Sequence, residues 1–336
     1  MKIIYIFDAT KDDPLGKVRG AGRYLQILKE NLAEAKFVSK TKLVPNDSIL
    51  VNPFFNIISL SAINGRVAKK QIAVIHDLIP LKYPSRFPLG LRGNYNVFLN
   101  KFLLRNYDHF VTDSLASKKD IVNLLKIPEN KITVIYPTAP KIFFEKNNKN
   151  SFKPPVAKYC LYVGDATWNK NRVNLARAIK KINVTGVFVG RVFEKQIADL
   201  RHPWQRELRL FLEEIKDDKR FIFPGFIEDY KLVNFYEQAS CNVLLSHDEG
   251  FGFSFLESAI LGTPSVMSDI PVFREISGEA ASLANPDNID EIAKKIEEIY
   301  SNEAVRKSWK IKALARAKYF SPAKFSRGWN EVFEKV

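Results

Sequence analysis

The chain has 336 residues, which predicts two domains at roughly 100–200 residues per domain. Apolar residues make up 46% and charged residues 26%, ordinary values that exclude a disordered or fibrous protein. No apolar run reaches the ~18–20 residues of a membrane-spanning helix. The first residues also lack the long apolar core of a signal peptide. We therefore expect a globular, cytoplasmic protein.

The positive charge is concentrated in the first part of the chain. Residues 1–154 hold 25 basic and 12 acidic residues, a net charge of +13. The remaining residues hold 27 and 25, a net charge of +2. This asymmetry predicts an anionic partner for the first part, such as a nucleic acid, a membrane surface or a phosphorylated substrate. A lysine-rich surface without any partner is the alternative interpretation.

Strand-like and helical segments alternate along the chain. The first part has strand-like runs at 2–9, 48–55, 71–78, 109–114 and 131–137, and helical patterns at 23–35 and 114–127. Residues 138–157 contain three prolines and no sustained period, which is typical of a linker. The alternation resumes with strands at 158–165, 184–192, 220–227, 240–247, 263–269 and 281–286, and helices at 171–182, 203–217, 229–239 and 252–261.

This pattern predicts an α/β protein with two Rossmann-like, doubly wound domains, at 1–154 and 155–318. Ligands of such sheets bind beyond the carboxyl ends of the strands, so we expect the site in a central cleft between the domains. Residues 319–336 form a helical pattern with an apolar stripe of Phe325, Trp329 and Phe333. Packing of this helix on the first domain is one interpretation.

The sequence predicts neither a disulfide nor a metal site. Cys160 and Cys241 lie in strand-like runs and are expected to be buried free thiols. The acid pairs at 12–13 and 217–218 lie in polar, exposed surroundings, which are unsuited to holding a metal ion. We therefore expect no cofactor and no metal.

The segment HDEGFGFSFLESAILGTPSV (247–266) follows a predicted strand and opens a helix. Gly250 and Gly252 allow a tight turn, and the amides of the first helical turn favour a phosphate or a developing negative charge. Glu249 and Glu257 bracket this turn. Two alternatives need no function: Ser254 and Glu257 fit a capping box, and Glu249 fits a solvated acid at a helix N-terminus.

The same segment resembles the EGFGLPxLEAMxxGxPV signature of the retaining group 1 glycosyltransferases of the GT-B fold. Further segments, in family order over about residues 1–320, are similar to it: RGAGRYLQILKENL, VIHDLIPLKYP, VTDSLASKKDIVNLLKIPENKITVIYP, YVGDATWNKN and FPGFIEDYKLVNFYEQAS. The VIHDLIPLKYP segment resembles the mannosyltransferase-like branch.

The resemblance implies roles for matching residues. Glu249 would contact the donor sugar, Glu257 the nucleotide ribose, and Lys170 the diphosphate. His76 would lie near the sugar and the acceptor hydroxyl. Five further positions would approach the donor through their backbone. Gly20 and Gly22 lie in the first loop of the first domain, and Phe251, Gly252 and Phe253 lie at the turn that opens the helix of segment 247–266.

One position departs from the family pattern. Asp165 stands where many members have an arginine, so we expect Arg191 to supply the missing cation. Pairing of Arg191 with an acid such as Glu194 is the alternative. For His76, a purely structural His-Asp hydrogen bond, with Asp77 next to it, also stays open.

The resemblance implies transfer of a sugar, preferably from GDP-mannose, to a lipid-linked or polysaccharide acceptor, with retention of configuration and without a metal. Donors such as dTDP-rhamnose, GDP-fucose or a UDP-sugar are alternatives. So are a phosphorylase, an epimerase and a basic nucleic-acid-binding protein, although no nucleic-acid-binding module is recognisable. Basic and apolar residues recur through 87–105, which predicts peripheral docking on the inner face of an anionic membrane. A core helix with a solvated basic face is the alternative.

Overall fold

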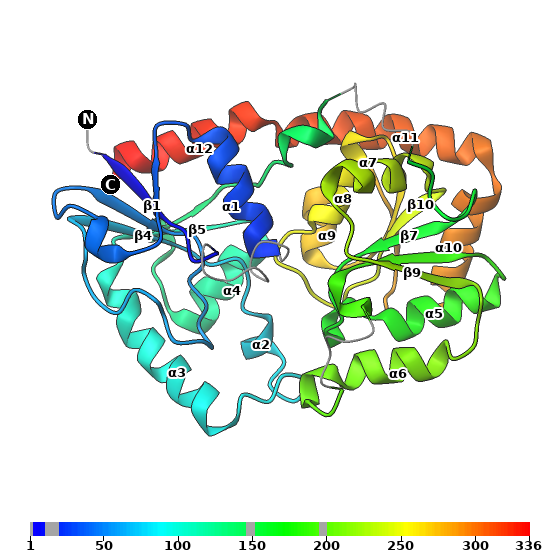
Figure 1. Cartoon of the computed structure of the whole chain (residues 1–336), viewed down its shortest axis with the longest axis horizontal. Coiled ribbons are helices and arrows are strands. Elements are labelled where there is room, and N and C mark those ends of the chain that lie inside the picture. Colours follow the sequence, from blue (N-terminus) through cyan, green and yellow to red (C-terminus); the bar gives the residue numbers. More distant parts are fainter. Residues whose placement is uncertain (1–2, 11–19, 146–151, 195–199) are drawn as a thin grey trace. The chain divides into compact units, whose positions relative to one another are not determined.

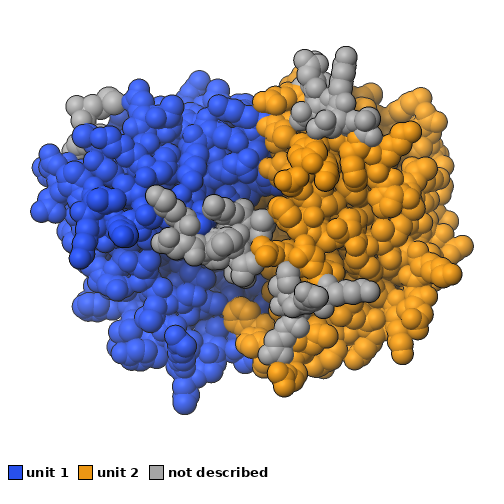
Figure 2. All heavy atoms as spheres, in the orientation of Figure 1, with its two compact units in different colours: residues 1–141, 320–336 blue, residues 142–319 orange. Residues whose placement is uncertain are grey.

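The computed structural model describes residues 3–10, 20–145, 152–194 and 200–336. These residues form two compact units, comprising residues 1–141 with 320–336, and residues 142–319 (Figure 2). The sequence placed the boundaries at 154 and 318 instead. The difference at the first boundary arises because the proline-rich segment from 142 onwards packs with the second unit, as Phe143 and Phe152 do against Tyr236 and Phe235.

The first unit is built on a six-stranded parallel sheet in the order β2-β1-β3-β4-β5-β6 (Figure 1). Every residue of β3 and β5 is buried, as expected for strands with helices on both faces of the sheet. The strands and helices are β1 (Ile4–Phe7), α1 (Gly20–Asn31), β2 (Lys36–Val38), β3 (Ile49–Asn52), β4 (Lys70–Val74), α2 (Ile79–Lys82), α3 (Gly90–Leu103), β5 (His109–Thr112), α4 (Leu115–Leu125), β6 (Ile132–Val134) and α12 (Pro322–Lys335).

Helix α12 returns the end of the chain to this unit. Ser321 caps it by accepting a hydrogen bond from the Lys324 amide, and Pro322 occupies its first turn. Phe325 and Trp329 are buried, and the Phe325 ring contacts Tyr24 of α1 edge-on, with centroids 5.9 Å apart. The aromatic stripe of this helix therefore completes the core of the first unit.

The second unit repeats the design with a six-stranded parallel sheet in the order β12-β11-β10-β7-β8-β9. Its elements are β7 (Cys160–Val163), α5 (Arg172–Lys181), β8 (Gly186–Val189), α6 (Arg206–Glu214), β9 (Phe221–Gly225), α7 (Asp229–Gln238), β10 (Cys241–Leu244), α8 (Phe253–Ile260), β11 (Ser265–Ser268), α9 (Pro271–Ser277), β12 (Ser282–Ala284), α10 (Ile289–Ser301) and α11 (Glu303–Ala317). The predicted doubly wound α/β architecture is therefore confirmed. Cys160 and Cys241 are buried free thiols on neighbouring strands, as expected.

Candidate functional site

The loop after β10 leads into helix α8 through a left-handed residue. Gly252 is the N-cap, with φ of 111°, and no side chain caps the helix. The Phe255 amide donates to the Gly252 carbonyl at 3.0 Å, whereas the amides of Phe253 and Ser254 stand at the helix positions that suit an anion. Phe251 is buried and its ring meets Phe253 edge-on at 5.5 Å, which fixes the backbone of this turn.

The capping-box interpretation of this helix start is wrong. Ser254 lies inside the helix, and its hydroxyl donates to Asn242 Oδ1 at 2.8 Å instead of capping an amide. Glu257 is nearly buried, with 3% of its surface exposed, and its Oε2 accepts a hydrogen bond of 2.9 Å from the Tyr236 hydroxyl of α7. Tyr236 was missed from the sequence because nothing there pairs α7 with α8.

Glu249 forms an ion pair with Lys170. Its Oε1 lies 2.5 Å from Lys170 Nζ and also accepts a hydrogen bond of 2.7 Å from Ser246 Oγ. Burial disfavours the charge of Lys170, but the Glu249 carboxylate more than compensates and raises the pKa of Lys170 to about 12. The solvated-acid interpretation of Glu249 does not fit this contact, since only 12% of its side chain is exposed.

Asn169 ties the two loops that carry this pair. Its Nδ2 donates to the Asp248 carbonyl at 3.0 Å, and its own carbonyl accepts from the His247 amide at 2.7 Å. These loops follow β7 and β10, which are neighbours in the sheet. The carboxyl ends of adjacent parallel strands thus bring Lys170 and Glu249 together, as the general rule for such sheets predicts.

Arg191 is the residue expected to supply the positive charge that the family pattern has at the position of Asp165. Arg191 follows β8 and is half-buried, and among the described residues it forms no ion pair with Glu194. Glu194 instead accepts a hydrogen bond of 3.0 Å from the Phe226 amide. The described residues therefore give no support to pairing of Arg191 with Glu194, and diphosphate binding by Arg191 stays a prediction.

A second arginine supports the Asp165 loop from inside. Arg172 is fully buried, donates from Nη1 to the Asp165 carbonyl, and lies over the rings of Tyr162 and Phe211 at 6.0 and 5.6 Å. Because Arg172 is fully buried and bonded to the Asp165 carbonyl, we interpret it as a structural residue that holds the loop leading to Lys170.

In the first unit, His76 follows β4 and uses both ring nitrogens. Nδ1 lies 2.6 Å from Asp113 Oδ2, and Nε2 lies 3.0 Å from the Pro53 carbonyl oxygen. A carboxylate and a carbonyl oxygen both accept hydrogen bonds, so these two partners favour the imidazolium form of the ring. Burial alone lowers the pKa of His76, but the charge and hydrogen bond of Asp113, with the Pro53 bond, outweigh it and raise the pKa.

The adjacent acid is not the partner of His76. Asp77 Oδ1 accepts a hydrogen bond of 3.1 Å from the Ile79 amide at the start of α2.

The ring of Tyr24, from α1, contacts His76 edge-on at 4.7 Å. Gly20 and Gly22 lie in the first turn of α1 rather than in the loop where the sequence placed them.

Among the described residues, no three His, Cys, Asp or Glu side chains are grouped to hold a metal ion. Asp12 and Asp13 lie outside these residues, and Asp218 pairs with Arg220 at 2.6 Å.

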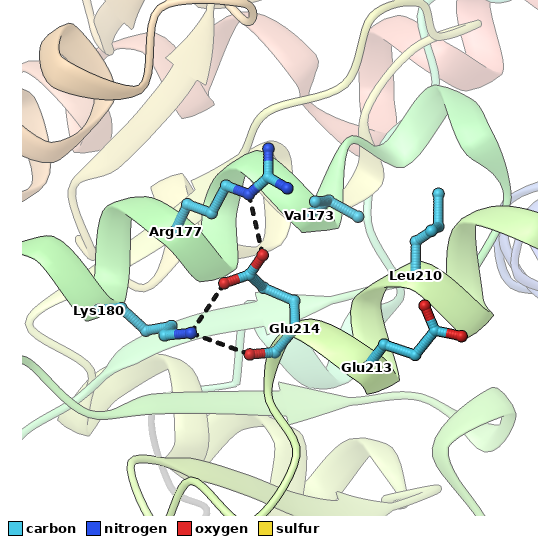
Figure 3. A pocket seen from close by; sticks show the side chains of 6 residues that line it. All are labelled: Val173, Arg177, Lys180, Leu210, Glu213 and Glu214. Atoms are coloured by element: carbon cyan, nitrogen blue, oxygen red, sulfur yellow. Dashed lines mark hydrogen bonds and ion pairs between the residues drawn. The ribbon is translucent and has the colours of Figure 1, made fainter.

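A surface pocket of about 430 Å³ between α5 and α6 contains none of the predicted site residues. Figure 3 shows that Glu214 in this pocket is already paired with Arg177 and Lys180.

A family model described as "Glycosyl transferases group 1" matches residues 143–316, more than half of the chain. The chain belongs to this family. The match covers Lys170, Arg191, Glu249 and the start of α8. The predicted membership of group 1 is therefore confirmed, whereas retention of configuration and the roles of the two glutamates stay predictions.

Two curated relatives are O-antigen or serotype mannosyltransferases. The chain is 29% identical over 231 residues to the "O-antigen chain mannosyltransferase RfbU" of Salmonella typhimurium, covering 66% of this chain and 58% of that protein. It is 24% identical over 331 residues to the "Serotype-specific mannosyltransferase WbdA" of Escherichia coli, covering 95% of this chain and 40% of that protein. The chain thus spans about half the length of these relatives or less.

Solved structures share the fold over most or all of the chain. Anabaena HepE, determined in complex with UDP, aligns with a TM-score of 0.68 at 17% identity over 100% of both chains. Sucrose-phosphate synthase from Thermosynechococcus elongatus aligns with the same TM-score at 18% identity, over 85% of this chain and 73% of that one. The GT-B fold predicted from the sequence is confirmed.

Proposed function

We propose that the chain is a retaining glycosyltransferase that transfers mannose from GDP-mannose to a lipid-linked or polysaccharide acceptor in surface glycan synthesis. The observation that carries this proposal is the contact of Lys170 with Glu249 beside the uncapped start of α8. It places a cation, a carboxylate and helix-end amides at one end of a parallel sheet. Family membership and the mannosyltransferase relatives support the sugar chemistry.

The charges suit the cleavage of a sugar–diphosphate bond, in which the sugar becomes positive and the leaving diphosphate negative. Lys170 and the amides of α8 would stabilise the diphosphate, and Glu249 would face the positively charged sugar. An ammonium has three N–H donors, so its bond to Glu249 leaves capacity for phosphate oxygens. Glu257 would accept hydrogen bonds from the ribose hydroxyls.

Retention would follow from attack on the same face of the sugar. The acceptor oxygen bonds to the anomeric carbon as the bond from that carbon to the phosphate oxygen breaks, and the acceptor proton passes to the leaving phosphate. This route needs no protein base. It agrees with a protonated His76, which would contribute positive charge and hydrogen-bonding geometry.

The test of the donor is a thermal-shift panel of GDP-mannose, GDP-fucose, dTDP-rhamnose and UDP-sugars. A donor at 100 times its dissociation constant should stabilise the protein by about 2.7 kcal/mol. With all donors compared at one concentration, we expect GDP-mannose to give the largest shift. We also expect it to yield a mannosylated product with the donor's anomeric configuration by NMR. An inverted product would overturn retention, and free nucleotide with an altered sugar would indicate an epimerase.

Metal independence is part of the proposal. Lys170 and the helix-end amides would stabilise the leaving group, the task that a metal performs in other transferases. We expect the same rate with excess EDTA as with magnesium. A loss of more than about tenfold in EDTA that magnesium restores would contradict this part alone.

We also propose that the enzyme works as a peripheral protein on the inner face of the membrane, where a lipid-linked acceptor is held. No helix among the described residues is long and apolar enough to cross a bilayer. The net charge of +13 on residues 1–154 suits an anionic surface.

A further inference from the structure

Helix α3 turns an apolar stripe toward solvent. The stripe consists of Leu91, Tyr95, Phe98 and Phe102, which are 93%, 60%, 70% and 61% exposed. At 3.6 residues per turn these four positions fall within about 60° of one another on the helix. In Figure 1 the helix is the cyan ribbon at the lower left, on the outside of its own unit. Four large apolar side chains on one exposed face point to an interaction surface.

The opposite face of α3 is buried and polar. Asn100 is fully buried and donates from Nδ2 to the carbonyls of Ile57 and Ser59, at 2.9 and 2.6 Å. Asn96 donates to the Ile58 carbonyl at 3.1 Å. These bonds hold the helix against segment 56–59, so the stripe cannot turn inward without leaving buried amides unpaired. The core-helix alternative is therefore wrong for this helix.

The surroundings of the stripe are strongly basic. Arg92 and Lys101 are exposed and lie about 90° to either side of it on the helix, and Arg105 follows at its end. Between residues 48 and 107 the chain has eight basic residues and one acidic residue, Asp77. An apolar stripe flanked by cations matches the boundary between anionic headgroups and acyl chains.

We propose that the α3 stripe docks on an anionic lipid bilayer, with Leu91, Tyr95, Phe98 and Phe102 inserted and Arg92 and Lys101 among the headgroups. The identity of the acceptor rests on the proposed function, but the docking surface does not. A second copy of this chain is a poorer occupant, because it would bring the same cations against one another. Phe87, which the sequence included in the docking segment, is buried and does not take part.

The experiment is co-sedimentation of the full chain, without donor, with vesicles of phosphatidylcholine alone or with phosphatidylglycerol added. We expect binding that needs the anionic lipid and weakens as salt rises. The double variant Leu91→Gln, Phe98→Gln should lower the partition coefficient by at least about tenfold. Its control is Ile311→Gln on α11, which removes one apolar side chain as exposed as that of Phe98 (70%) and should leave the partition coefficient unchanged.

The cations are tested separately. Arg92→Gln, Lys101→Gln should lower the partition coefficient about 25-fold, because each basic residue near an anionic surface accounts for about fivefold. The control Lys216→Gln, Lys294→Gln removes two exposed charges of the second unit and should leave binding unchanged. An equal loss of vesicle binding in the α3 double variant and in the control double variant would show that only the net charge of the protein matters. That result would overturn docking through α3.

Two further outcomes also overturn the proposal. One is no sedimentation with anionic vesicles at low salt. The other is a dimer in sedimentation velocity that Phe98→Gln dissociates. Sugar transfer to a detergent-free saccharide acceptor, measured on the same variants, should equal that of the wild type. A wild-type protein that transfers sugar but does not bind anionic vesicles would overturn the docking surface alone, whereas one that binds the vesicles but transfers no sugar would overturn the proposed function alone.

Discussion

Lys170 Nζ lies 2.5 Å from Glu249 Oε1, so the two residues to which the resemblance gave different parts of the donor are partners of each other. They are 79 residues apart in the chain and lie, partly buried, in the loops that follow β7 and β10. The carboxylate keeps the ammonium charged, with a pKa raised to about 12. The pair thus holds a cation ready for a diphosphate throughout the neutral pH range.

The pair predicts strong coupling between the two positions. Glu249→Gln should abolish transfer and, because it leaves Lys170 without its anion, lower the free energy of unfolding by about 1–3 kcal/mol. Lys170→Met should do the same. The double variant should be more stable than the sum of the two losses predicts, by about 1–2 kcal/mol. Urea unfolding of the four proteins measures this coupling, and additive losses would mean that the pair is not formed in solution.

The second glutamate predicts a different response. Glu257→Gln should mainly weaken donor binding, because hydrogen bonds from ribose hydroxyls to a carboxylate contribute roughly 1.5–3 kcal/mol. Tyr236→Phe removes the bond that orients Glu257 and should raise the dissociation constant for the donor less, by about 1 kcal/mol or a factor of five. Calorimetric titration with the donor distinguishes them. Unchanged affinity in both variants would leave Glu257 a purely structural residue.

The sequence predicts the sheets well but not the pairs within the site. Short runs that contain apolar residues mark β3, β5 and β10, and every residue of these strands is buried. Strand β2 was missed, since it has only three residues, none of them is buried, and it lies at an edge of the sheet. Lys170–Glu249 and His76–Asp113 were missed because strand order brings their loops together, and alternation along the chain does not specify that order.

Helix α3 shows a second limit. Its periodicity predicts an amphipathic helix, and the usual rule places the apolar face in the core. In α3 the buried face is instead the one that carries Asn96 and Asn100. Their side-chain amides donate hydrogen bonds to carbonyl groups of segment 56–59, and buried carbonyl groups require such donors. Which face turns inward therefore depended on a segment some forty residues away.

The N-cap of α8 predicts that Gly252 tolerates no side chain. Its φ of 111° is strained for any other residue, and an added Cβ would lie 3.0 Å from Ile276 Cδ1 and 3.1 Å from the Phe273 ring. Gly252→Ala should lower the free energy of unfolding by about 1–3 kcal/mol and reduce donor affinity, as the amides before α8 shift. The control Gly65→Ala has no atom within 4 Å of its added Cβ. Equal stability of the two variants in urea would contradict this account.

Two histidines of the first unit predict opposite effects of pH on stability. The pKa of His76 is raised in the folded protein, so this residue binds more protons folded than unfolded. Its stabilising effect is complete below about pH 6.5 and is lost as pH rises through its folded pKa. The pKa of His109 is lowered to about 4, chiefly by burial and then by Lys335 and Lys131. It therefore destabilises the fold as pH falls from about 6.5 to about 4.

The measurement compares wild type with His76→Gln and with His109→Gln by urea unfolding from pH 4.5 to 9. Subtracting each variant from wild type cancels the other titrating groups. The His76 difference should decrease as pH rises above about 6.5 and then become constant. The His109 difference should instead increase with pH below about 6.5, by on the order of 2–3 kcal/mol over the full interval. Because both residues lie in one unit, the same unfolding transition reports both. A His76 difference that stays flat from pH 5.5 to 9 would show that Asp113 does not hold an imidazolium.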